Sequence, residues 1–560
     1  MSNRREGGKT GGREGVWRLV VLAAILLPVF PPSRLSAQYP DAWVIPRGTL
    51  RIGFEPKYIS ASQRFDTTGT PEPLGTNFSD DSASVRLIPT LFNPQNAIWS
   101  ITGDSSITIN AGAFRTGLVA DVRRLPFNFS VGLTDRITLT ASVPLVTTRS
   151  QVSLEVDSTN ADLGWNQAAS QAGNATAIAQ IQSLLGELEA AAVFVEGQIA
   201  AAGYDCPSGP ICNQARTAVM DARRMQMDIT LLSGVDAMNG AGELLPPFSP
   251  MGGSATGQAV TGAIATLVAE LTALGAPAVT STLPLPNSPV LREDVDAMLT
   301  DPVFGYSATT LGLTKYSNRF GDIEIGMRYG VAQNDKLRAV LIGNVRLPTG
   351  SRDLPENYTD IGSGDKQTDV ELRLESVWMP GTHLTLALDA SYTMQLGDRL
   401  ERRVMPYYRP YATLATQTTV QRNLGDMFRI GLYPALRLSS AFTAYASASY
   451  FYKLADKFTL TTPLDVPPSL GGPVSAADLA ANTTYQSIFF GAGLYYRMDR
   501  GRHVAKLPIE AGLDYRTAFG GTGGRTPKTT TVNFFLRLYW RLWGGPPAEE
   551  GPEAEQPIGR

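Results

Sequence analysis

Residues Leu125–Leu145, LPFNFSVGLTDRITLTASVPL, set a pattern that the rest of the chain repeats. Apolar residues take every second position before and after a short turn at 134–136. Because neighbouring side chains of a strand point to opposite faces, this alternation predicts two antiparallel strands with their apolar side chains on one face. Any half-buried sheet alternates in this way, so the recurrence of the pattern decides the fold.

The alternation returns in long segments joined by short turns. In chain order these segments are 49–63, 125–145, 323–347, 369–394, 428–453, 486–517 and 531–543. They predict twelve strands, or fourteen if residues 66–119 hide a further hairpin. Long strands with one apolar face are typical of a barrel in lipid, where an open sheet edge would leave backbone groups unpaired. The fold class is therefore an all-β membrane protein, a closed antiparallel transmembrane β-barrel of about twelve strands with a large α-helical insert.

The sequence divides into five segments. Residues 1–37 are a predicted signal peptide, because an apolar run at 19–30 follows several arginines and small residues precede position 38. Residues 38–157 form the first barrel segment, 158–318 the insert, 319–543 the remainder of the barrel and 544–560 a disordered tail. The apolar run is too short to span a membrane. We expect export to the bacterial outer membrane, with the lipid bilayer and the barrel-assembly machinery as partners.

The insert has helical periodicity. Apolar residues step by three and four positions over 178–199, 218–232 and 260–274, which predicts an antiparallel coiled-coil hairpin with a third helix alongside. Cys206 and Cys212 lie in the loop between the first two helices, where an exported chain would form a local disulfide worth about 2 kcal/mol. The bundle either projects as a recognition surface or covers the barrel mouth, and the sequence leaves both open.

Composition excludes several classes of function. The chain has 560 residues and a net charge of −3, without the basic stripe of a nucleic-acid-binding protein. An outer-membrane phospholipase needs a serine and a histidine near the outer leaflet, but His383 and His503 both fall beside short turns and no GxSxG motif occurs. Two cysteines alone cannot complete a zinc site. We expect no enzyme activity, no cofactor and no metal.

Two stretches resemble a known family. FGDIEIGMRY at 320–329, followed by VRLPTG at 345–350, is similar to a pattern in the outer-membrane barrels of the MetA-pathway of phenol degradation family. VGLTDR at 131–136 resembles that family's YGLTD turn, with Val131 in place of tyrosine. The resemblance covers residues 120–150 and 320–540, and the insert departs from it. It implies a barrel that takes up small hydrophobic or aromatic compounds, distantly similar to long-chain fatty-acid transporters.

Charged residues occupy the faces opposite the apolar ones, which predicts that they line the lumen. They are Asp322, Glu324, Arg328, Asp369, Glu371, Arg373, Glu375, Asp389, Arg429, Arg437, Glu510, Asp514, Arg516, Arg537 and Arg541. Both signs are mixed, so these charges either line a solute path or pair across strands and hold the wall. Three functions remain: a channel for a small-molecule solute, a surface adhesion or recognition protein that displays the helical bundle, and a structural outer-membrane protein.

The alternation of short turns and long connections predicts the topology. Outer-membrane barrels have short periplasmic turns and long outer loops, so the insert should face outward. We expect an antibody to reach a tag inserted at Ser208 on intact cells, whereas a tag after Gly544 should need permeabilised cells. The opposite labelling would reverse the topology.

Overall fold

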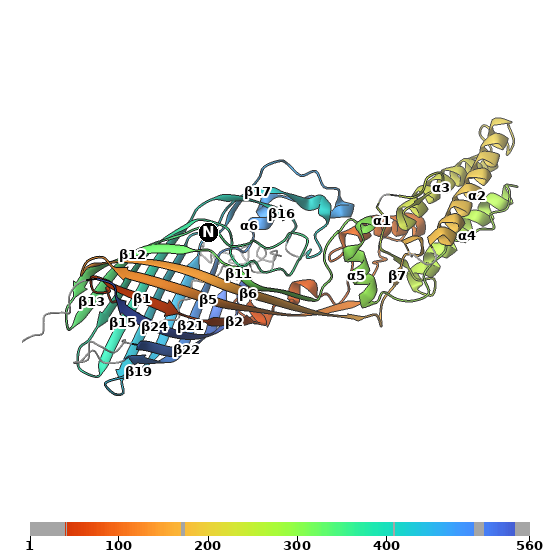
Figure 1. The fold of residues 1–560 in the computed structure, drawn as a ribbon. Coiled ribbons are helices and arrows are strands. Elements are labelled where there is room, and N and C mark those ends of the chain that lie inside the picture. Colours follow the sequence, from red (N-terminus) through yellow and green to blue (C-terminus); the bar gives the residue numbers. More distant parts are fainter. Residues whose placement is uncertain are drawn as a thin grey trace, which may run out of the picture.

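The computed structural model describes residues 40, 42–169, 174–242, 244–406, 409–497 and 509–543. Twelve strand positions form one antiparallel sheet, which closes because the last strand pairs with the first (Figure 1). At two of these positions the strand is interrupted and consists of two consecutive segments, β1 followed by β2 and β11 followed by β12. The barrel strands are β1 (Thr49–Phe54), β2 (Lys57–Ala61), β5 (Ala113–Gly132), β6 (Ile137–Asp157), β11 (Leu313–Phe320), β12 (Glu324–Gln333), β13 (Leu337–Arg346), β14 (Asp369–Trp378), β15 (Leu384–Gln395), β18 (Met427–Arg437), β19 (Phe442–Lys453), β21 (Tyr485–Arg497), β22 (Ile509–Thr522) and β24 (Thr530–Arg541). The predicted closed barrel of twelve strands is confirmed.

The alternative of fourteen strands is wrong. Residues 62–112 contain β3 (Gln63–Phe65), β4 (Pro71–Pro73) and helix α1 (Phe92–Thr102), and none of these joins the barrel sheet. The apolar residues of this stretch instead enter the hydrophobic core that α1 shares with the insert, where Ile98 is fully buried.

Strands β5 and β6 are far longer than a barrel wall requires. They contain 20 and 21 residues, whereas about 9–11 residues cross a membrane. Their extra length forms an arm that carries the insert away from the barrel (Figure 1). Residues 313–318, predicted as part of the insert, belong to β11 because they pair with the β6 side of this arm.

The apolar face of this hairpin changes sides along its length. Near the turn, Phe129 and Leu139 point outward and are exposed. Beyond Arg123 and Thr147 the outward positions are mostly polar, while Phe114 and Leu154 are buried on the inner face. This change of the apolar face fits an outward face that contacts lipid between these residues and the turn, and water on the side toward the insert.

The wall has an apolar outer face and a densely packed interior. Leu374, Leu432 and Phe534 on three separate strands point outward and are exposed. Inside, the ring of Tyr445 lies over Gly493 on the neighbouring strand, where a Cβ atom would meet the ring at 2.5 Å. Glycine at that position therefore makes room for a large inward side chain.

The predicted helical insert is confirmed. Its helices are α2 (Asn174–Ala200), α3 (Pro210–Ser233), α4 (Ala255–Ala273) and α5 (Arg292–Thr300). Helix α2 is long and apolar enough to cross a membrane by length and composition, but its residues Leu184 and Leu188 are buried in the core of the bundle. The backbone N–H and hydroxyl of Ser281 hold the Glu187 carboxylate and lower its pKa to about 2, which ties the chain after α4 to α2.

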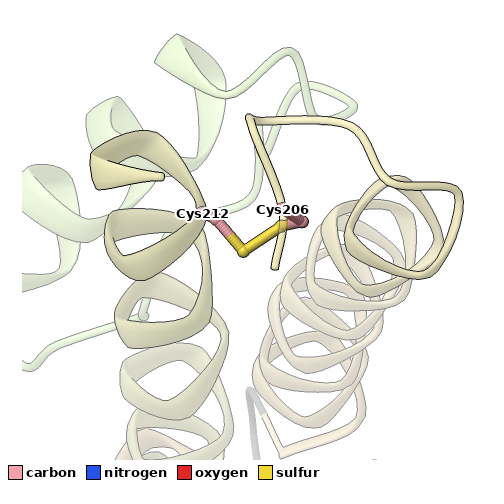
Figure 2. The surroundings of a disulfide bond; sticks show 2 residues. All are labelled: Cys206 and Cys212. Atoms are coloured by element: carbon pink, nitrogen blue, oxygen red, sulfur yellow. A yellow bond between two sulfur atoms is a disulfide. The ribbon is translucent and has the colours of Figure 1, made fainter. Parts of the chain in front are cut away.

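A disulfide joins Cys206 and Cys212 at the tip of the bundle (Figure 2). Their Cα atoms are 5.0 Å apart, and the bond links the α2–α3 loop to the first turn of α3. The bundle stands beyond the barrel on the arm, so it does not cover the barrel mouth (Figure 1).

The long connections of the other strands pack together at the same end of the barrel as the arm. They contain a small sheet of β16 (Asp398–Arg403), β17 (Gln417–Asn423) and β20 (Lys457–Leu460), and a short helix α6 (Ala476–Ala480). We call this the long-loop end and the opposite one the short-turn end. The signal peptide at 1–37, the tail at 544–560 and His503 lie outside the described residues.

The outward face generates a prediction about depth. Leu432 and Leu436 lie on the same face of β18, but Leu432 is near the middle of the strand and Leu436 is next to the short turn. We expect Leu432→Arg to lower the free energy of unfolding from lipid by about 2–4 kcal/mol and Leu436→Arg by at most about 1 kcal/mol. Equal losses in a denaturant titration would contradict contact with lipid.

Candidate functional site

The barrel interior carries most of the charged residues predicted to face it. Thirteen of the fifteen are buried or half-buried inside the wall. Arg437 and Arg541 are the exceptions, since both are exposed at strand ends beside the short-turn rim. The two-residue pattern of the sequence places them on the inward face of their strands. It does not show how far along the strand a residue lies. These two arginines therefore lie at the rim, apart from the thirteen other residues.

Opposite charges meet across the inner face of the wall, either on neighbouring strands or with one strand between them. Arg328 lies 2.7 Å from Glu375, and Asp389 lies between Arg373, at 2.6 Å, and Arg429. Further pairs join Arg124 to Glu324 at 3.2 Å, Arg537 to Glu510 at 3.5 Å and Arg537 to Glu55 at 3.4 Å. Removing one partner of such a buried pair costs about 3–5 kcal/mol, because the other charge is then left buried without a partner.

The chain before β1 closes the short-turn end. Residues 42–45, which we call the plug, lie inside the barrel, where Ala42 and Val44 pack against inward apolar residues. These residues are Val340, Ile342, Val377, Ala387, Tyr433, Ala435 and Tyr445. The backbone N–H of Ile45 donates to the hydroxyl of Thr138 at 2.9 Å. The Trp43 ring lies against two guanidinium groups, 4.4 Å from that of Arg338 and 5.0 Å from that of Arg497.

A second closure lies toward the long-loop end, in the connection between β13 and β14. Asp322, in the break between β11 and β12, is 2% exposed. Its carboxylate accepts the backbone N–H of Gly350 at 2.7 Å and that of Asp365 at 3.1 Å. The hydroxyl of Thr349 donates to the carbonyl of Gly321 at 2.9 Å. We call these contacts the latch, because they hold the two ends of the loop at residues 350–365 against the wall of the barrel.

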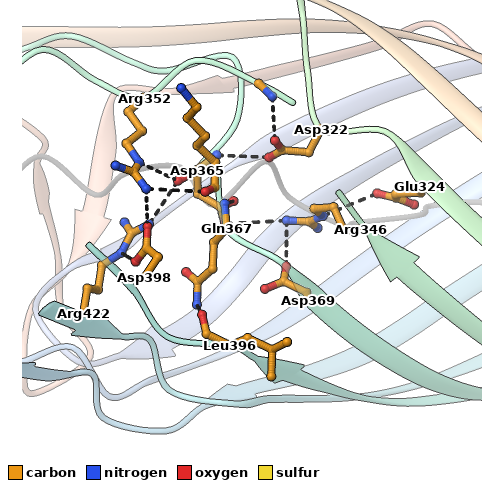
Figure 3. A network of polar contacts seen from close by, with 12 residues as sticks. Asp322, Glu324, Arg346, Arg352, Asp365, Gln367, Asp369, Leu396, Asp398 and Arg422 are labelled. Atoms are coloured by element: carbon orange, nitrogen blue, oxygen red, sulfur yellow. Dashed lines mark hydrogen bonds and ion pairs between the residues drawn. The ribbon is translucent and has the colours of Figure 1, made fainter. Parts of the chain in front are cut away.

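Arginines extend the latch in both directions (Figure 3). Arg346, only 1% exposed, lies 3.1 Å from Asp369 and 3.7 Å from Asp365. On the other side, Arg422 lies 2.9 Å from Asp398 and donates to the carbonyl of Asp365 at 3.0 Å. The loop is therefore bound both to the wall and to the small sheet outside it.

The latch accounts for the residues that carry the family resemblance. In the Gly-Asp pair at 321–322, the Gly321 carbonyl accepts the hydroxyl of Thr349 and the Asp322 carboxylate accepts the backbone N–H of Gly350, so both donors come from the LPTG stretch at 347–350. Gly364 is required by space, because a Cβ atom there would lie 2.3 Å from the Asp322 carboxylate. Burial raises the pKa of Asp360 in the same loop.

A cavity of about 180 Å³ lies within the barrel. Six basic and four acidic side chains line it: Arg51, Lys57, Arg124, Arg328, Arg373 and Arg537, with Glu55, Glu324, Glu371 and Glu375. Pro126 and Ile342 add apolar surface. Ile342 also packs against the plug, and Glu324 also pairs with Arg346 beside the latch. The cavity therefore lies between the two closures.

Sequence reasoning missed the plug, the latch, the lining residue Arg124 and three lining residues of the first strand, Arg51, Glu55 and Lys57. The alternation in residues 49–63 already places these three side chains on the polar face of the first strand. The apolar run Trp43-Val44-Ile45 was the signal for the plug. Among the described residues, no group of three or more His, Cys, Asp or Glu side chains is placed to hold a metal ion.

Comparisons with known proteins show similarity of fold alone. Neither a protein-family model nor a curated protein sequence matches the chain. Among solved structures, the COG4313 outer membrane channel from Pseudomonas putida F1 is 9% identical, with a TM-score of 0.38 over 90% of this chain and 99% of that one. A Pseudomonas aeruginosa FadL homologue is 8% identical, with a TM-score of 0.24 over 88% and 90% of the two chains. The Pseudomonas putida toluene transporter TodX is 10% identical, with a TM-score of 0.24 over 89% and 90%.

The latch generates a prediction about the loop. We expect Gly364→Ala to push Asp322 away and release the loop, so that trypsin cuts at the exposed Lys366 faster than in the unchanged protein. Gly381→Ala is the matched control, because a Cβ atom at that turn meets nothing within 4 Å. Equal cleavage rates in both variants would show that the latch does not hold the loop.

Proposed function

We propose that this protein is an outer-membrane channel for small hydrophobic or aromatic compounds, closed at both ends in the conformation described above. The observation that carries the proposal is a closed barrel with an apolar outer face and an internal cavity. A water-soluble barrel would carry polar side chains on that outer face, whereas a barrel in lipid must expose apolar ones.

The outer face supports a membrane position. Leu372 is 56% exposed and Leu513 is 54% exposed, although both side chains are large and apolar. Trp378 and Trp540 are exposed near the short-turn ends of their strands, the place where aromatic residues lie at a membrane interface. Export by the signal peptide, insertion by the barrel-assembly machinery and the outward direction of the insert belong to the same proposal.

The two closures differ in the number of parts that they hold. The plug is one short segment held mainly by apolar contacts, and burying one valine stabilises it by about 1.5–3 kcal/mol. The latch joins the loop to Asp322 by charged hydrogen bonds worth about 1.5–3 kcal/mol each, and Arg422 binds the same loop to the small sheet. Opening at the short-turn end therefore moves fewer parts of the protein than opening through the latch.

The solute class rests on the family resemblance in residues 320–329 and 345–350. The described cavity is small, so folded or polymeric solutes do not fit it. The mixed charges along the wall allow polar groups on the solute, provided that the buried ion pairs keep their partners.

A surface recognition protein is the second candidate. The bundle stands clear of the barrel on its arm, and α3 exposes Met220, Met227 and Leu231 at helical spacing. A bundle that only supported the barrel would not need to project in this way. Loss of cell adhesion on deletion of the bundle, with unchanged solute uptake, would favour this candidate.

The channel proposal predicts that opening the plug creates a pore. Val44 is 6% exposed, and Val44→Asp would bury a charge without a partner, so the segment should leave the barrel. We expect Val44→Asp to raise the conductance of planar bilayers well above that of the unchanged protein. Leu133→Asp, at an exposed turn position, is the control and should have no effect. Background conductance from a correctly folded, heat-modifiable Val44→Asp barrel would contradict the channel.

A further inference from the structure

The cavity contains a basic side chain for which the wall supplies no counter-charge. Lys57 on β2 lies directly opposite Arg124 on β5, and both side chains line the cavity. Like charges in directly opposed positions of a sheet destabilise it. Arg124 has Glu324 at 3.2 Å, but within the described residues Lys57 has no ion pair within 4 Å and no side-chain hydrogen bond.

The acidic residues of the cavity are already engaged elsewhere. Glu55 pairs with Arg537, and Glu324 pairs with Arg124. Glu375 pairs with both Arg328 and Arg373. Glu371 accepts a hydrogen bond at 3.0 Å from the side-chain amide of Asn344. Four carboxylates therefore face five arginines in the cavity, and Lys57 adds a further positive charge to that excess.

The buried guanidinium of Arg516 adds to this excess of positive charge. Arg516 is 3% exposed, and its Nε and Nη2 atoms have no hydrogen-bond partner among the described residues. Its guanidinium lies 4.8 Å from the centre of the Phe489 ring. The charged groups within electrostatic range of Lys57 are Glu55 and Asp514, which are acidic, and Arg124 and Arg516, which are basic.

Asp514 does not neutralise Lys57 by direct contact. The side-chain amide of Asn533 lies between them along the strand ladder and donates to the Asp514 carboxylate at 3.0 Å. A half-buried ammonium without a partner is costly, and an anion in the cavity would reduce that cost. The cavity also has apolar surface from Pro126 and Ile342.

We propose that the cavity binds a small organic acid, with the carboxylate held by the Lys57 ammonium and the Arg124 guanidinium and the apolar part against Pro126 and Ile342. The inference rests on the proposed channel function and narrows its solutes to those that combine an apolar body with an acidic group. Benzoate has both features, and benzyl alcohol has the same ring without the charge.

The test compares these two probes on the full-length chain carrying Val44→Asp, which opens the cavity. We expect benzoate to block ion current in planar bilayers at concentrations where benzyl alcohol does not. Adding Lys57→Gln should weaken the block by at least about tenfold, because a charged hydrogen bond is lost, whereas Lys57→Arg should keep it. Lys315→Gln removes an exposed lysine from the outer face of β11 and should change nothing.

The outcomes separate the inference from the channel proposal. If the pore conducts while both probes block it equally, or if benzoate blocks the Lys57→Gln variant as strongly as its parent, the anion site is refuted. Either result leaves the channel proposal standing. If the pore does not conduct, the channel fails, and equilibrium dialysis with labelled benzoate decides the site alone. Binding that Lys57→Gln weakens about tenfold would support the site, and absence of binding to a folded barrel would overturn it.

Discussion

The pairing of β24 with β1 and β2 is the contact on which the rest of the structure depends. A sheet in lipid cannot leave an edge unpaired, because no water is present to hydrogen-bond its N–H and C=O groups. Closure fixes which side chains face the bilayer and which face the lumen, and so confines many charged groups to a narrow interior. The charge pairs, the latch and the plug all follow from the need to satisfy and fill that interior.

The interior is divided into layers. An apolar layer that includes Val44 and Tyr433 closes the short-turn end, and the Asp322 latch closes the other. The cavity lies between them, lined by side chains of both signs. This arrangement is consistent with the proposed channel, in which a solute enters only when one closure moves, and the plug is the smaller of the two closures.

Local patterns in the sequence predicted the elements well. Two-residue alternation identified the strands, and three- and four-residue steps identified α2, α3 and α4, because both periods follow from backbone geometry alone. The two-residue period does not encode how far along a strand a residue lies. Arg437 and Arg541 were therefore assigned to the lumen although they lie at the rim. The latch depends on a loop folding back onto Asp322 from 28 residues away, a contact that no periodicity encodes.

The central claim is that lipid contacts the outward face of β5 only between Arg123 and the short-turn end. Spin labels placed singly on outward positions of β5 measure this directly, through their accessibility to oxygen, which concentrates in lipid, and to a water-soluble nickel chelate. We predict that labels at Leu125, Phe127 and Phe129 favour oxygen and that labels at Arg115 and Val119 favour the chelate, with the change at Arg123. Lipid-like accessibility along the whole strand, or water-like accessibility at all positions, would contradict the account.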